Sequence, residues 1–263
     1  MRLKYILLLV IVSVLKCHAF SQEITKKSIV IQVMTYNIHH ANPPAKEHVI
    51  DIDAIARTIA DTGADIVALQ EVDVHTKRSG YINEAEILAK KLNMHVFFSK
   101  AIDFDEGEYG LAILSKFKIE DPRSIRLSSV ADTSAEPRIL QLVTLKIAKT
   151  TSFLFANTHL DVLETGNRLL QAKQITELVR SQNLPMIIAG DWNDTITSKT
   201  LDIMDGEFTR SCEICPVTCQ EDEKAIDFIA YSKSSLFKIK KHTVFSENNS
   251  SDHYPVLAEI AID

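Results

Sequence analysis

The sequence predicts an α/β fold in which two mixed β-sheets pack against each other and helices cover their outer faces. Three observations lead to this prediction. Strand-like apolar runs are numerous, helical segments are few, and the two kinds follow one another in mixed order. The chain of 263 residues is 46% hydrophobic and 24% charged, which suits one large core. No repeat or long Pro/Gly/Ser linker divides the chain, so we expect a single domain.

Three segments repeat apolar residues at the spacing of one helix face. These predicted helices lie at residues 52–60, 85–92 and 172–179. Gly63 and Asn93 are expected to end the first two helices, because both residue types tolerate the left-handed conformation of a helix end. The third helix must end before Pro185.

The remaining apolar runs have the length and composition of strands. They lie at residues 31–36, 65–70, 95–98, 111–114, 140–147, 153–158, 187–190, 225–230, 243–245 and 256–260. Gly190 ends the most informative of these runs, Ile187-Ile188-Ala189-Gly190, and lets the backbone bend where the strand leaves the sheet.

Six of these strands begin or end in Asn, Asp, Glu or His. The residues are Asn37, Glu71, His159, Asp191, Asn193, Asp227, Asp252 and His253. Taken singly, each of them is equally well explained as a turn residue or a buried hydrogen-bond partner. Together they offer oxygen ligands for a hard cation and imidazoles for proton transfer, which predicts a metal-assisted hydrolytic site.

Residues 1–19 have the order of a secretory signal peptide: basic residues, an apolar run, and a small-residue site that ends at Ala19. The apolar run is short for a membrane span. A retained membrane anchor is one alternative; a lipid anchor on Cys17 is another, which the neighbouring lysine disfavours. We therefore expect a secreted or periplasmic protein whose single domain comprises residues 20–263.

Removal of residues 1–19 takes away three basic residues and no acid, so the formal net charge changes from −6 to −9. Because phosphate contacts dominate the affinity of proteins for long nucleic acids, this charge argues against a DNA-coating function. Cys212, Cys215 and Cys219 lie in one loop-like segment, without an obvious fourth ligand for zinc. They therefore predict either a local disulfide or free thiols.

Six short motifs, in order along the chain, resemble those of the endonuclease/exonuclease/phosphatase (DNase I-like) superfamily, and of its secreted bacterial members in particular. The motifs are Thr35-Tyr36-Asn37-Ile38, Leu69-Gln70-Glu71-Val72, Asn157-Thr158-His159-Leu160, Gly190-Asp191-Trp192-Asn193, Ile226-Asp227-Phe228-Ile229 and Ser251-Asp252-His253. The resemblance implies a four-layer α/β/β/α sandwich, in which two mixed sheets are flanked by helices.

The resemblance also implies roles for individual residues. Glu71 resembles the principal ligand of Mg²⁺ or Mn²⁺, with Asn37 and Asp252 beside it. Asp191 resembles the acid that orients or deprotonates the attacking water or holds a second metal, and Asn193 would bind a phosphate oxygen.

His253 resembles the catalytic histidine whose tautomer is set by Asp227. His159 resembles the second histidine of the DNase and sphingomyelinase branches, and Glu108 is its expected carboxylate partner.

Two arginines are candidates for binding substrate phosphate, because their segments resemble those of secreted bacterial members of the superfamily. Arg138 follows Glu136-Pro137 at a strand start, and Arg78 follows Glu71 in a loop; the alternative for both is a solvated surface charge. His39 and His40 either line the same cleft or have a structural role.

The sequence thus predicts a secreted, divalent-metal-dependent phosphodiesterase. The alternatives are a phosphomonoesterase of the inositol-phosphatase type and a non-catalytic phosphate-binding protein on the same fold. The expected substrate is a small phosphodiester, a phospholipid headgroup or extracellular nucleic acid. We expect a monomer without a stable protein partner.

Overall fold

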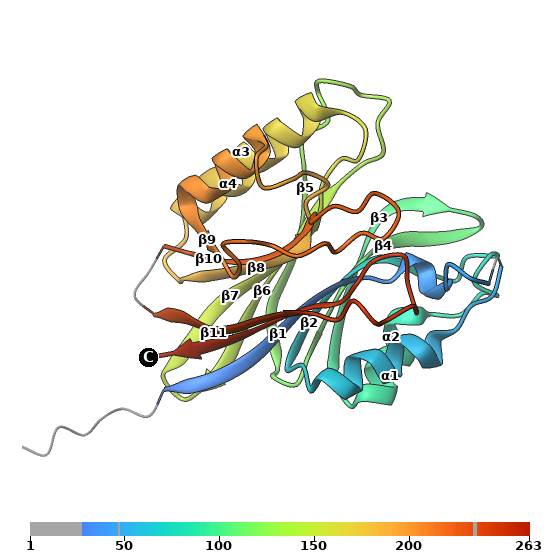
Figure 1. The fold of residues 1–263 in the computed structure, drawn as a ribbon, viewed down its shortest axis with the longest axis horizontal. Coiled ribbons are helices and arrows are strands. Elements are labelled where there is room, and N and C mark those ends of the chain that lie inside the picture. The colour runs from blue at the N-terminus through green and yellow to red at the C-terminus, as the bar shows by residue number, and fades with distance from the viewer. Residues whose placement is uncertain (1–27, 47, 234–235) are drawn as a thin grey trace, which may run out of the picture.

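A computed structural model of the chain describes residues 28–46, 48–233 and 236–263. These residues form two six-stranded sheets that pack face to face, with a pair of helices on each outer side (Figure 1). The predicted four-layer α/β/β/α sandwich is therefore confirmed. The predicted signal peptide over residues 1–19 lies outside the described residues. Within the part of the chain that is described, no helix has the length and apolar character needed to cross a membrane.

The first sheet has the strand order β11-β12-β1-β2-β4-β3. Its strands are β11 (Phe237–Val244), β12 (Val256–Ile262), β1 (Ile29–Asn37), β2 (Ile66–Val74), β4 (Gly107–Ser115) and β3 (His95–Phe104). Helices α1 (Ile52–Thr62) and α2 (Glu84–Leu92) cover its outer face, and a short helical turn, η1 (His39–Ala41), follows β1 (Figure 1).

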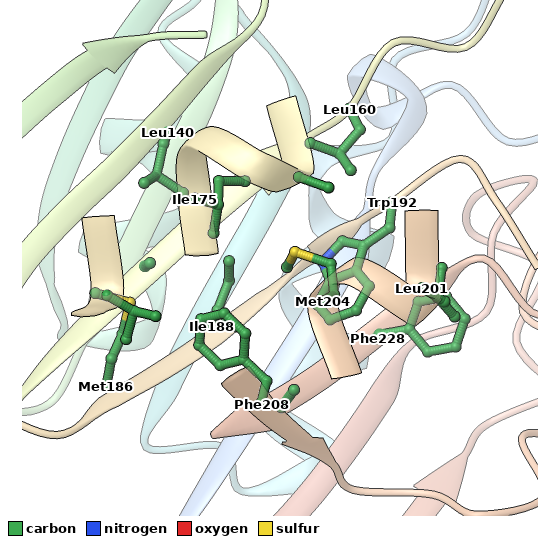
Figure 2. Packing of buried hydrophobic residues seen from close by; sticks show 14 of the residues in the cluster. Leu140, Leu160, Ile175, Met186, Ile188, Trp192, Leu201, Met204, Phe208 and Phe228 are labelled. Atoms are coloured by element: carbon green, nitrogen blue, oxygen red, sulfur yellow. The ribbon is translucent and has the colours of Figure 1, made fainter. Parts of the chain in front are cut away.

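The second sheet has the order β5-β6-β7-β8-β10-β9. Its strands are β5 (Ile119–Arg126), β6 (Ile139–Ala148), β7 (Thr151–His159), β8 (Met186–Asp191), β10 (Asp227–Ser232) and β9 (Phe208–Arg210). Helices α3 (Thr165–Arg180) and α4 (Lys199–Glu207) cover this sheet. The packing beneath them is centred on Trp192, Met204 and Phe228, and the Trp192 and Phe228 ring centroids are 5.1 Å apart (Figure 2).

The inner strands are apolar on both faces, because each face is covered. In β8, Ile187 and Ala189 point into the core between the two sheets, whereas Met186 and Ile188 point toward α3 and α4 (Figure 2). This two-residue alternation within a continuous apolar run is the pattern of a strand buried on both sides.

The three predicted helices are confirmed, and all three end as expected; α3 ends at Arg180, before Pro185. Gly63 and Asn93 adopt the left-handed conformation after α1 and α2. Their backbone N–H groups donate hydrogen bonds to carbonyl oxygens in the last turn of each helix. The sequence analysis missed β5, β9 and α4, and predicted only residues 243–245 of β11. Strands β5, β9 and β11 lie at sheet edges and carry exposed polar residues, so hydrophobic periodicity does not reveal them.

Three buried amide side chains join the two sheets. Gln70 on β2 donates a hydrogen bond to Asn157 Oδ1 (2.8 Å), and Asn157 Nδ2 donates to Gln141 Oε1 on β6 (3.0 Å). Asn157 also donates to the backbone oxygens of Leu69 and Ala112 in the opposite sheet. A buried amide without these partners would be costly, so the network fixes one sheet relative to the other.

Gly190 lies so close to β7 that no larger residue fits. An added Cβ atom would lie 2.0 Å from the backbone oxygen of Thr158, and Gly190 has a φ of +155°. We expect Gly190→Ala to lower the free energy of unfolding by about 3 kcal/mol or more, because the two backbones must separate. Gly206→Ala is the matched control, since nothing lies within 4 Å of its added Cβ. Urea denaturation that found the two variants equally stable would contradict this prediction.

Candidate active site

The topology brings the polar strand ends together at one edge of the sandwich. Strands β1 and β2 run parallel in one sheet, and β7 and β8 run parallel in the other, so their carboxyl ends lie on the same side. Strand β10 runs antiparallel to β8 and begins at that side, where Asp227 pairs with Asp191. The loop before β12 delivers Asp252 and His253 to the same place.

A cleft of about 420 Å³ opens at this edge. Seven of the predicted site residues line it: Glu71, Arg138, His159, Asp191, Asn193, Asp252 and His253. Asn37 and Asp227 are buried beside it and hydrogen-bond to residues that line it. The structure thus brings together nine of the eleven residues to which the sequence analysis gave a role in the site; His39 and His40 do not line this cleft.

Glu71 reaches the cleft because β2 is irregular at this point. The pairing register of β2 with β4 shifts between Leu69 and Val72, and Glu71 has a φ of +58°. Such a bulge redirects a side chain out of the strand. Asn37 Nδ2 then donates to Glu71 Oε1 (2.9 Å) and to Asp191 Oδ2 (3.2 Å), and so holds the two carboxylates on either side of one amide.

The residues at this end of the cleft fit a hard divalent cation. Glu71 and Asp252 both present carboxylates to the cleft, and the Asp252 side chain is 32% exposed. Asn37 adds an amide oxygen, which accepts a hydrogen bond from the backbone N–H of His39 (3.1 Å). Oxygen donors of this kind are the ligands that Mg²⁺ and Mn²⁺ prefer.

His253 and Asp227 form a buried pair. The distance from His253 Nδ1 to Asp227 Oδ2 is 2.8 Å, within hydrogen-bonding range. Burial lowers the pKa of His253, but the charge and the hydrogen bond of Asp227 outweigh burial and raise this pKa well above its usual value. This shift favours the cationic form of the imidazole, whose Nε2 lies 3.8 Å from Asp191 Oδ2.

Asp191 lies between two imidazoles. Its Oδ2 is 3.5 Å from Nε2 of His159, and its Oδ1 accepts the backbone N–H of Asn193 (2.9 Å). Burial and the nearby Asp227 carboxylate raise the pKa of Asp191, while His253 opposes the rise. The pKa of His159 is well below its usual value because of burial and the positive charges of Arg138 and His253. The shifts thus favour a neutral imidazole and a cationic one on either side of a carboxylate whose pKa is raised.

Arg138 is buried, with its guanidinium in the cleft. Its Nη1 pairs with Glu136 (3.0 Å), whereas its Nε has no hydrogen-bond partner among the described residues. Because Arg138 lines the cleft, its guanidinium is placed to bind an anionic oxygen. Asn193 also faces the cleft, and its Nδ2 donates one hydrogen bond to the backbone oxygen of Leu160 (2.9 Å).

The structure places two of the singled-out residues outside the cleft. Glu108 pairs with Lys100 (3.3 Å) on the neighbouring strand instead of with His159, so the expected Glu108–His159 contact is not formed. Arg78 makes two hydrogen bonds to the buried carboxylate of Asp73 (2.7 and 2.8 Å) and stacks on Phe104. Its charge is therefore offset by Asp73, so Arg78 matches neither the expected phosphate-binding residue nor a solvated surface charge.

The cleft also contains residues that the sequence analysis did not place in the site. They are Tyr109, Glu136, Val162, Cys219, Glu221, Asp222 and Ile226. Most of them lie in loops or at strand starts without a recognisable motif, so only their position in space reveals them. Of the two alternatives for the cysteines, the structure contains the local disulfide, between Cys212 and Cys215; Cys219 is a free, buried thiol.

The sandwich and its cleft define a class of protein: a hydrolase with acids and histidines at the common edge of two sheets. Residues 34–253 match the model of the Endonuclease/Exonuclease/phosphatase family. The chain therefore belongs to this family and is a phosphoric ester hydrolase. No curated protein matches the sequence.

Several solved structures share this fold. An endonuclease/exonuclease/phosphatase family protein from Bacteroides thetaiotaomicron is 22% identical, with a TM-score of 0.74, and the match covers 90% of this chain and 99% of that chain. A mannosyl-6-phosphatase from the same species is 25% identical, with a TM-score of 0.73 and coverages of 88% and 99%. The human Nocturnin catalytic domain is 20% identical, with a TM-score of 0.70 and coverages of 90% and 97%.

The Asp227–His253 pair predicts a pH effect. If cationic His253 supports the reaction, activity falls as pH rises through the raised pKa of this imidazole. Asp227→Asn removes the anion that raises this pKa, so the alkaline fall should begin at least about one pH unit lower. The maximal rate should also drop by about 100-fold. The measurement is the pH profile of phosphoesterase activity.

Asp202→Asn, which changes an exposed acid on α4, is the control for this pH experiment. An alkaline limb at the same pH in Asp227→Asn and in the unmodified chain would show that His253 does not act through its charge.

Proposed function

We propose that this chain is a divalent-metal-dependent hydrolase of small phosphodiesters. The observation that carries the proposal is the composition of the cleft. Six acids line it, Glu71, Glu136, Asp191, Glu221, Asp222 and Asp252, and Arg138 is the one permanently charged cation among the described lining residues. Such a site needs a bound cation before it attracts any phosphate, and then favours an ester with little negative charge.

Glu71, Asp252 and Asn37 would hold Mg²⁺ or Mn²⁺. When bound, the cation supplies positive charge that offsets the developing oxyanion of a phosphoester. The residues of the chain perform the remaining tasks. Arg138 binds and orients a phosphate oxygen, and Asn193 has an amide hydrogen left to donate to another.

Proton transfer falls to the group around Asp191. Its raised pKa suits a base that accepts a proton from an attacking water. His253, held in its cationic form by Asp227, donates to an anionic oxygen of the phosphate or of the leaving group. His159 donates a neutral hydrogen bond beside them, since its pKa keeps it uncharged.

A diester fits the charge of the cleft better than a monoester or a polymer. A diester phosphate carries one negative charge, whereas a monoester carries up to two and a nucleic acid carries one per residue. Glu136, Glu221 and Asp222 line the cleft with negative charge and would repel the more charged substrates.

A phosphomonoesterase is the second candidate. The similarity to a mannosyl-6-phosphatase, at 25% identity over 88% of this chain, supports it. In that case the extra charge of the monoester would have to be met by the cation and by Arg138.

We also propose that the protein acts outside the cytoplasm as a monomer. The signal-like order of residues 1–19 supports export, and the Cys212–Cys215 disulfide suits an oxidising compartment. The cleft of a single chain holds the acids, both histidines and Arg138, so the proposed reaction needs no residue from a second chain.

Metal dependence is directly testable. We expect excess chelator to abolish phosphoesterase activity and Mg²⁺ or Mn²⁺ to restore it, because the cleft acids repel a phosphate without a cation. Glu71→Gln should raise the Mg²⁺ concentration for half-maximal activity at least about 10-fold, since it removes a charged ligand. Glu86→Gln, an exposed acid on α2, is the matched control. Full activity in chelator, or an unchanged Mg²⁺ titration in Glu71→Gln, would disprove the assignment.

Substrate class can be decided with matched chromogenic esters. We expect bis-p-nitrophenyl phosphate to be hydrolysed with a higher kcat/KM than p-nitrophenyl phosphate, and plasmid DNA to remain intact, because of the negative cleft. The double variant Glu221→Gln/Asp222→Asn should reduce the ratio of kcat/KM for bis-p-nitrophenyl phosphate to kcat/KM for p-nitrophenyl phosphate. Preference for p-nitrophenyl phosphate or mannose 6-phosphate would instead establish the second candidate.

A further inference from the structure

Two histidines beside Glu71 are not used by the proposed reaction. His39 and His40 form the turn η1 directly after β1, and Glu71 lies on the bulge of the adjacent strand β2. One ligand atom from each of the three side chains lies within 4.8 Å of those from the other two. All three side chains are partly exposed, so an ion from solvent can reach them.

His39 is oriented as a metal-binding histidine requires. Its Nδ1 lies 3.1 Å from the backbone oxygen of Asn42, to which it can only donate. This hydrogen bond leaves the lone pair on Nε2. In a metal-binding imidazole, the N–H of the other ring nitrogen usually donates a hydrogen bond to a carbonyl or carboxylate in this way. That bond sets the ring orientation and the tautomer.

His40 has a polar atom that the protein leaves unsatisfied. Its Nδ1 is buried and has no hydrogen-bond partner among the residues that the structure describes. The ring centroids of His39 and His40 are 4.4 Å apart at an interplanar angle of 70°, so the rings meet edge to face. Arg78 contributes a nearby positive charge, but its two hydrogen bonds to Asp73 offset it.

The backbone that carries these side chains is held in an unfavourable conformation. The φ angles of His39, His40 and Ala41 are +45°, +41° and +55°, and that of Glu71 is +58°. Residues with a Cβ rarely adopt such angles, least of all three in succession. Strain of this kind persists where the fold holds side chains in a set arrangement, as at ligand sites.

We propose that His39, His40 and Glu71 form a second cation site, next to the oxygen-lined magnesium position and sharing Glu71 with it. Two imidazole nitrogens and one carboxylate oxygen are a ligand set that favours Zn²⁺ and related transition ions over Mg²⁺. Such a site binds its ion whether or not the chain hydrolyses phosphodiesters.

The test is a titration of the metal-free full chain with Co²⁺, in which binding is measured by the visible absorption of the bound ion. Zn²⁺ is then added as a competitor. We expect one Co²⁺ per chain that Zn²⁺ displaces and millimolar Mg²⁺ does not. His39→Asn and His40→Asn should each weaken Co²⁺ binding by about 100-fold, since each removes one of three ligands. Asparagine is chosen because it tolerates a positive φ, so the turn should still form.

His95→Asn is the control, because His95 is an exposed histidine at the start of β3. Ser115 pairs with both His95 and Ile66, so His95 lies level with the start of β2, whereas Glu71 lies further along that strand. Circular dichroism confirms folding of each variant. Unchanged Co²⁺ affinity in both His39→Asn and His40→Asn would overturn the proposal. Hydrolysis of bis-p-nitrophenyl phosphate with Mg²⁺ is measured separately on the unmodified chain. If the unmodified chain binds Co²⁺ through the histidines but does not hydrolyse the ester, the proposed function is wrong and this site stands. If the chain hydrolyses the ester but does not bind Co²⁺ through the histidines, this site is wrong and the proposed function stands.

Discussion

The hydrogen bonds among Gln70, Asn157 and Gln141 are the constraint on which the site depends. The hydrophobic effect has no direction, so burial of apolar surface does not by itself select particular partners across the two sheets. Buried amides do have direction, and each must find its partners or pay for its desolvation. Gln70 precedes Glu71, and Asn157 lies two residues before His159, so the same bonds that join the sheets also set the distance across the cleft.

Charge is the second constraint, and it explains why buried hydrogen bonds are dense around the acids. Asn37 separates the carboxylates of Glu71 and Asp191, and the Asp227 carboxylate is paired with His253. Each acid in the interior thus has a donor beside it, which lowers the cost of burying the charge. The acids that face the cleft have fewer partners within the protein, and their remaining charge is the physical basis for proposing bound cations.

Much of the fold was predictable from local patterns. Helices α1 and α2 combine a periodic apolar face with a left-handed residue at the end, and β8 combines an apolar run with a glycine that β7 requires. The site residues that follow strands were also predictable. The ends of neighbouring strands lie close together at one edge of a sheet, so polar residues placed there are expected to meet. The sequence analysis assigned Glu108 to His159 and Arg78 to the substrate phosphate. In the structure Glu108 pairs with Lys100 and Arg78 with Asp73, so each charge already has a partner of opposite sign. Nothing in a linear motif reveals such pairing.

The sequence by itself determined the layers, most strands and helices, and the residue types at the catalytic edge, because hydrophobic period and strand ends are local properties. The tertiary structure alone decided which charges meet. It paired Asp227 with His253, set His159 against Asp191, placed Arg138 in the cleft, paired Arg78 with Asp73, and brought the two histidines of η1 beside Glu71. These outcomes depend on distances between segments far apart in the chain, and electrostatic and hydrogen-bond energies change steeply with those distances.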